Sequence, residues 1–140
     1  MRELEYTAWE TSVPEAVRQD RLWRLQVYRL ALYVTYLSWR DARDLQRHIG
    51  TAGVTDQLLR SAGSVGANIA EGCSRGTGAD RARFYEYALG SARECRHWYL
   101  SAQAALGISV VAARVEILAS IARLLLAALP NIRRRAVRRL

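Results

Sequence analysis

Apolar residues recur at intervals of three and four along most of this chain, and seldom at intervals of two. A helix buried along one face has this spacing, because its residues repeat every 3.6 positions, whereas a half-buried strand alternates. The two prolines, Pro14 and Pro130, lie near the ends and leave the pattern between them uninterrupted. The pattern therefore predicts an all-helical chain.

Glycines mark three breaks in this pattern, at Gly50, between residues 72 and 78, and at Gly107. Pro14 suits a first helical turn, and glycine suits the position just after a helix end. Four helices joined by short connections favour an antiparallel up-down four-helix bundle. The predicted helices span residues 14–48, 55–73, 80–106 and 110–129, within a single domain of residues 1–131 that precedes a basic C-terminal tail, 132–140.

The expected core follows from the apolar stripe of each helix. Its predicted members include Leu30, Leu58, Ile69, Phe84, Trp98 and Leu118. The first helix carries a second apolar stripe, so it has more apolar surface than one bundle core can bury. We therefore predict a homo-oligomer whose interface shares this surface with the core. The expected contributors are Trp23, Tyr28, Tyr33, Tyr36 and Trp39.

The charge is strongly positive, with 21 basic residues, all of them arginine, against 13 acidic ones, and a formal net charge of +8. Such a surplus favours a polyanionic partner, and guanidinium groups bind phosphate in a bidentate manner and stack on unpaired bases. We predict binding to RNA or another nucleic acid. The candidate residues are Arg40, Arg43 and Arg47 on one face of the first helix, and Arg133, Arg134, Arg135, Arg138 and Arg139 in the tail. The alternative is a solvated arginine face paired with Asp41, Asp44 and neighbouring acids.

Polar residues form a stripe beside the apolar face of both central helices, with Asn68 and Glu71 on one helix and Ser91 and Glu94 on the other. If the stripes face each other, they form either a buried hydrogen-bond network or an acid/base or metal site. Glu94 and His97 make one ExxH pair, whereas di-iron bundles need two such pairs and two further glutamates. We predict a structural network without metal or cofactor.

One enzymatic alternative rests on Arg43 and His48, whose R-x4-H spacing is similar to that of the RNA-cleaving HEPN families. Histidine would act as the acid/base and arginine would hold phosphate. Because this spacing arises easily by chance in an arginine-rich chain, and no P-loop, dinucleotide fingerprint or nucleophile elbow is present, a non-enzymatic function is favoured.

The sequence also predicts a cytoplasmic location without membrane insertion. The first ten residues, MRELEYTAWE, lack the basic start and apolar run of a signal peptide. Cys73 and Cys95 have no CxxC spacing and are expected to be free and buried in a reducing compartment. Residues 110–129 are long enough to span a bilayer, but charged residues such as Arg114 interrupt them at helical spacing.

Two segments carry a family resemblance: LLRSAGSVGANIAEG, from Leu58 to Gly72, followed by Arg75, and Phe84 with ALGSARE, from Ala88 to Glu94. They resemble the four-helix-bundle family named for the 23S rRNA intervening-sequence protein. The chain departs from that pattern at Gly66, where proline is common, and at Tyr85, where leucine is usual.

This resemblance implies an up-down bundle that assembles as a ring, commonly a homopentamer, without an established catalytic activity. Members are encoded inside ribosomal RNA insertions, and distantly similar basic bundles are accessory subunits of diversity-generating reverse transcriptases. The expected partners are therefore further copies of the chain, RNA and a reverse transcriptase.

Overall fold

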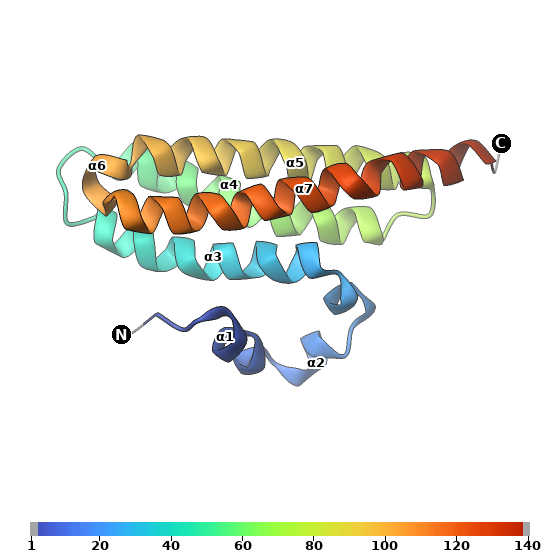
Figure 1. Cartoon of the computed structure of the whole chain (residues 1–140), viewed down its shortest axis with the longest axis horizontal. Coiled ribbons are helices and arrows are strands. Elements are labelled where there is room, and N and C mark those ends of the chain that lie inside the picture. Colours follow the sequence, from blue (N-terminus) through green and yellow to red (C-terminus); the bar gives the residue numbers. More distant parts are fainter. Residues whose placement is uncertain (1–2, 139–140) are drawn as a thin grey trace.

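Four long helices form the body of the computed structural model, which describes residues 3–138 and the side chains of residues 3–135. They are α3 (Gln26–Leu45), α4 (Ala52–Cys73), α5 (Gly78–Ser101) and α7 (Ile108–Arg138). Each packs against two of the others, and successive helices run in opposite directions (Figure 1). The described part of the chain has no strand, and the prediction of an all-helical chain is confirmed.

The interior of these four helices contains most of the predicted core. Leu58, Ile69 and Leu118 are buried, and Leu30 and Trp98 are half-buried against them. Phe84 was wrongly assigned to the core. Its half-buried ring lies beneath the guanidinium groups of Arg75 and Arg83, at 4.7 and 5.4 Å, and meets the edge of Tyr87.

The first predicted helix, 14–48, is divided, and only α3 is a long helix. Before it come α1 (Tyr6–Ser12), α2 (Glu15–Arg18) and the 3-10 turn η1 (Arg21–Arg24). Val13 is extended at ψ 136°, as the residue before a proline prefers, and Leu25 is extended at ψ 111°. The Asp20 side chain accepts a hydrogen bond from the Leu22 amide at 2.7 Å and so caps the short turn between these breaks.

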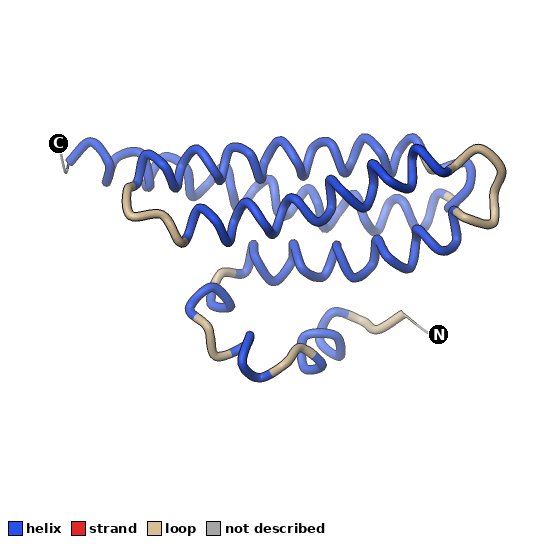
Figure 2. The backbone as a smooth tube through the Cα atoms, turned by 180° about the vertical axis from the view of Figure 1, so that it is seen from behind, coloured by secondary structure: helices blue, strands red, loops and turns tan. Residues whose placement is uncertain are grey.

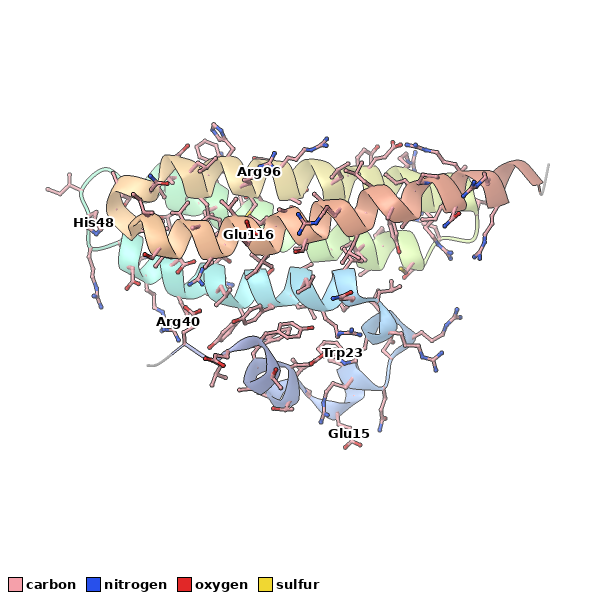
Figure 3. The ribbon with its side chains drawn as sticks, in the orientation of Figure 1. Glu15, Trp23, Arg40, His48, Arg96 and Glu116 are labelled. Carbon is pink, nitrogen blue, oxygen red and sulfur yellow. The ribbon has the colours of Figure 1, made fainter. Side chains whose placement is uncertain are left out.

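Residues 3–24, here called the N-terminal segment, run along the side of α3 that faces away from α5 (Figure 1). Trp9, Tyr33 and Leu37 form a second buried apolar cluster between the segment and α3. Trp23 projects from the segment towards α3 (Figure 3) and packs on this cluster, as does Tyr36. The second apolar stripe of α3 thus finds its partner within the chain.

Because the N-terminal segment covers α3, most of the residues that were assigned to a subunit interface already pack against other parts of the same chain. The prediction of a homo-oligomer therefore loses this argument. Tyr28 packs on the main core, and Tyr33 is buried. Trp39 stays outside, with 60% of its surface exposed. Homo-oligomer formation stays a prediction, and the apolar surface of α3 no longer requires a second copy.

The connections between the long helices are short (Figure 2). Gly50 follows α3 with φ 80°, and the Thr77 hydroxyl caps α5 by accepting from the Asp80 amide at 3.2 Å. The third predicted helix, 80–106, is broken at Ala102, after which the single turn α6 (Gln103–Leu106) leads to Gly107 at φ 90°. Glycine suits both positive φ values, because it has no Cβ to clash.

The last helix continues past the predicted end at Leu129, so residues 132–138 are not a separate tail. Pro130 removes one backbone donor, yet α7 runs to Arg138. Leu129 is buried and Ile132 packs on the core, which holds the helix together on both sides of the proline. None of the helices described is long and apolar enough to cross a membrane.

Close packing of α4 on α5 generates the first testable prediction. A Cβ added at Gly72 would lie 3.1 Å from both Phe84 Cβ and Tyr85 Cδ1, whereas one added at Gly63 meets nothing within 4 Å. Gly72→Ala should lower the free energy of unfolding by about 1–3 kcal/mol, because α5 has to shift. Gly63→Ala should raise it by about 0.5–1 kcal/mol, because alanine favours the helix. Urea denaturation of both variants checks this, and equal effects would contradict the packing.

Candidate nucleic-acid interface

Three of the predicted nucleic-acid-binding arginines converge at one end of α3. Arg40, Arg43 and Arg47 line a hollow of about 160 Å³ together with Asp44. Helical spacing explains this convergence, since residues three and four apart lie on one face. Arg40 and His48 lie at the end of the bundle opposite the C-terminus (Figure 3). We call Arg40, Arg43 and Arg47 the α3 arginine cluster.

Asp41 belongs to the same helix, but its side chain points into the bundle. It is 3% exposed and accepts hydrogen bonds from Arg114 Nε at 2.8 Å and Nη2 at 3.0 Å. The hydroxyl of Tyr99, which is fully buried, donates to Asp41 Oδ2 at 2.8 Å. Burial raises the pKa of Tyr99 well above its usual value and keeps this hydroxyl a donor. Three helices, α3, α5 and α7, therefore meet at one buried carboxylate.

The same guanidinium holds the N-terminal segment. Arg114, which is 4% exposed, donates from Nη1 and Nη2 to the two carboxylate oxygens of Glu3, at 3.1 and 2.8 Å. Burial alone would lower the pKa of Arg114, but the hydrogen bonds to Asp41 and Glu3 outweigh it and raise the pKa. The hydrogen bond from Arg114 lowers the pKa of Glu3. Next to Glu3, the Leu4 carbonyl accepts from the Tyr33 hydroxyl at 3.0 Å.

In this arrangement the two carboxylates nearest to Arg40, Asp41 and Glu3, are both hydrogen-bonded to Arg114, and the charge of Arg40 contributes to the lowered pKa of Glu3. Asp41, which the alternative interpretation paired with these arginines, is taken up by Arg114. Asp44 reaches Arg47 only at 3.9 Å, on the exposed surface. Arg40 and Arg43 make no ion pair with any side chain in the described range, and Arg40 Nη1 is buried without a hydrogen-bond partner.

The arginines predicted in the C-terminal tail lie far from the α3 arginine cluster. Arg114 contacts Asp41 at the level of that cluster, and the 19 residues from Arg114 to Arg133 span about 28 Å of helix. Arg133 pairs with Glu86, Arg134 bonds Asn131, and Arg135 lines a small cavity. Of Arg138 only the backbone is described, and Arg139 lies outside the described residues. The predicted arginines therefore lie in two separate groups, at opposite ends of the bundle (Figure 1).

The predicted polar network of the central helices is not present as expected. Glu71 and Glu94 are exposed, and Asn68 and Ser91 are half-buried. Glu71 pairs with Arg75 at 2.5 Å, and Glu94 accepts from Trp98 Nε1 at 3.3 Å. Each carboxylate therefore bonds a side chain four residues further along the chain, and neither bonds the other helix. Asn68 donates to the Ser64 carbonyl one turn away, at 2.9 Å. The prediction that the carboxylates lie inside was wrong, because their stripe lies on the outer side of the packed helix pair.

The ribonuclease alternative receives no support from the geometry. Arg43 lines the α3 hollow, whereas His48 lines a different one, of about 250 Å³, with Gly50, Thr55 and neighbouring residues. An acid/base histidine has to reach the same phosphate that the arginine holds. The R-x4-H spacing does not place these two side chains at one site.

Three residues of this region were not predicted from the sequence to have a role in it: Glu3, Tyr99 and Arg114. The available signal was Arg114 itself, an arginine within an apolar helix. Such a residue is almost always paired when it is buried. Its partners, 73 and 111 residues away along the chain, could not be read from local spacing.

Comparison with known proteins places the bundle in a family. Residues 24–124 match the family described as 23S rRNA-intervening sequence protein. The chain belongs to this family. The resemblance inferred from the two central motifs is thereby confirmed, while residues 3–23, which contain nearly all of the N-terminal segment, precede the matched range. No curated protein matches the chain.

A solved structure has the same fold. It is described as the crystal structure of a protein with unknown function from the S23 ribosomal protein family of Bacteroides thetaiotaomicron VPI-5482. The two chains are 22% identical and superpose with a TM-score of 0.67, over 74% of this chain and 97% of the other. Neither the family description nor this structure names an enzymatic activity.

The two aspartates of α3 provide a matched test of the site geometry. Asp41→Asn should lower the free energy of unfolding by about 3–5 kcal/mol, because it leaves the buried Arg114 without its main counter-charge. Asp44→Asn, three residues away and exposed, should change it by less than about 0.5 kcal/mol. Chemical denaturation at neutral pH measures both. A similar effect of the two substitutions would show that Asp41 is not buried against Arg114.

Proposed function

We propose that this chain is a non-enzymatic RNA-binding protein that holds single-stranded RNA through the α3 arginine cluster. The observation that carries the proposal is the convergence of Arg40, Arg43 and Arg47 on one hollow whose only acid is Asp44. A hollow of about 160 Å³ is too small for most organic ligands but accepts a phosphate group. Arginine suits phosphate because its planar group donates two parallel hydrogen bonds.

Trp39 favours an unpaired strand over a duplex. It lies next to Arg40 in sequence and one helical turn from Arg43, and 60% of its surface is exposed. Proteins that bind single-stranded nucleic acid combine a basic groove with aromatic side chains on which bases stack. An exposed tryptophan beside three arginines provides both elements on one surface.

The family supports an RNA setting, since its description names the 23S rRNA intervening sequence. An accessory role beside a reverse transcriptase, or in another RNA-handling complex, would use the same surface. A ring of several copies, such as the predicted pentamer, would repeat the cluster around its axis and raise avidity. A protein–protein adaptor without nucleic-acid binding is the competing function, and the arginines would then be surface charges only.

The salt dependence of RNA binding tests the proposal. Replacing Arg40, Arg43 and Arg47 by alanine should weaken binding of a single-stranded oligoribonucleotide. It should also reduce the slope of log affinity against log salt concentration by about 2, since each phosphate contact contributes about 0.7. Fluorescence anisotropy at several salt concentrations measures both quantities.

A matched control removes the same charge elsewhere. Arg60, Arg93 and Arg123 are exposed and lie on three different helices, so their combined replacement by alanine also removes three positive charges. The control variant should keep most of the affinity and a slope close to that of the unsubstituted chain. If both triple variants lost RNA affinity equally, the loss would be due to net charge and not to the α3 arginine cluster. Negligible RNA affinity at low salt would overturn the proposal and leave the adaptor function.

A further inference from the structure

The opposite end of the bundle contains two neighbouring cavities that share one side chain, Arg81. The smaller, about 130 Å³, lies between the Gly76–Gly78 turn and α7 and is lined also by Arg135. The larger, about 360 Å³, lies between η1 and the ends of α4 and α5. We propose that this pair of cavities binds one unpaired nucleotide, with its phosphate in the smaller cavity and its base in the larger.

The smaller cavity has the chemistry of a phosphate site. Its lining includes two arginines and the hydroxyl-bearing Thr77 but no carboxylate. Arg81 lines both cavities and makes no ion pair among the described residues, so its charge faces the cavities without a counter-charge. A phosphate group would accept hydrogen bonds from the two guanidinium groups, whose positive charges would balance its own.

The larger cavity has the size and lining of a site for a small organic group. Its volume falls within the lower range of ligand pockets, whereas the α3 hollow lies below it. Leu22, Leu25 and Tyr85 supply apolar and aromatic surface, and Arg21 and Ser74 supply polar groups at the edge. Its one carboxylate, Asp20, is engaged by the Leu22 amide at 2.7 Å. This mixture of polar and apolar side chains suits the edge and face of a base.

The family match does not account for this site. Residues 24–124 match the family, but Asp20, Arg21 and Leu22 precede that range, and Ile132 and Arg135 follow it. Both cavities are therefore closed by segments outside the matched bundle. The ligand class rests on the proposed function, since an RNA strand supplies such nucleotides, but the residues are distinct from the α3 arginine cluster.

Three probes and three variants test the site. Isothermal titration calorimetry compares adenosine monophosphate, adenosine and inorganic phosphate on the full chain. Adenosine monophosphate should bind more tightly than either part alone. Arg81→Ala and Arg135→Ala should each weaken its binding by about tenfold or more, because each removes a charged hydrogen bond. Neither should change the weak binding of adenosine.

Arg83→Ala is the matched control, because Arg83 lies on the same helix, two residues from Arg81, and pairs with Asp80 at 3.3 Å. It should change the affinity for adenosine monophosphate less than twofold, as expected for a substitution outside the cavities. If Arg81→Ala does not fold, the affinity of Arg135→Ala for adenosine monophosphate is compared with that of Arg83→Ala instead, because Arg135 is exposed. No binding of adenosine monophosphate at millimolar concentration, affinity equal to that of phosphate alone, or an equal loss in Arg83→Ala would overturn the proposal. Because RNA binding by the α3 cluster is measured separately, either idea can fail without the other.

Discussion

The buried guanidinium of Arg114 is the constraint on which the arrangement of this protein depends. A charged group inside a helical bundle is tolerated only when it is paired and hydrogen-bonded on all sides. Arg114 meets this condition with Asp41 on one side and Glu3 on the other, which ties α7 to α3 and both to the N-terminal segment. The pairing also has an effect at the surface. Because Asp41 turns inward to Arg114, it makes no ion pair with the neighbouring Arg40 and Arg43.

The two ends of the bundle differ in the ligand that we propose for each. At one end lies the hollow of the α3 arginine cluster, for which we propose phosphate, and Trp39 is exposed on the same helix. At the other, about 28 Å away along α7, Arg81 and Arg135 border the two cavities that we propose for a nucleotide. An extended strand has the length to contact both ends, whereas a mononucleotide does not. The N-terminal segment contributes residues at both ends. Glu3 bonds Arg114 at the first, and Arg21 and Leu22 line the larger cavity at the second.

Much of the fold was predictable because it depends on local periodicity. The apolar spacing gave the helices and placed Leu58, Ile69 and Leu118 in the core. The central motifs gave the family. The predictions that failed are those that depend on which neighbouring element a helix face packs against. Spacing placed Glu71 and Glu94 on one stripe of each helix, but it could not tell whether that stripe faces the partner helix or solvent.

The same limit applies to the second apolar stripe of α3. Spacing showed that it needs a cover, and a second copy was a reasonable candidate. The cover in the structure comes from the N-terminal segment, whose short helices and extended breaks leave little periodic signal. The partners of Arg114 are equally remote in sequence. The α3 arginine cluster was predictable as a set, because Arg40, Arg43 and Arg47 share one helical face, but its separation from Arg133 follows only from the packing.

Amide hydrogen exchange tests directly whether Arg114 docks the N-terminal segment on the bundle. The Trp9 amide donates to the Glu5 carbonyl at 2.9 Å within α1, so it should be protected in the unsubstituted chain. Glu3→Gln should speed exchange throughout α1, because it weakens the hold of Arg114, and should leave α4 and α5 unchanged. Exchange of the α1 amides at the rate of an unstructured peptide in the unsubstituted chain would contradict the account.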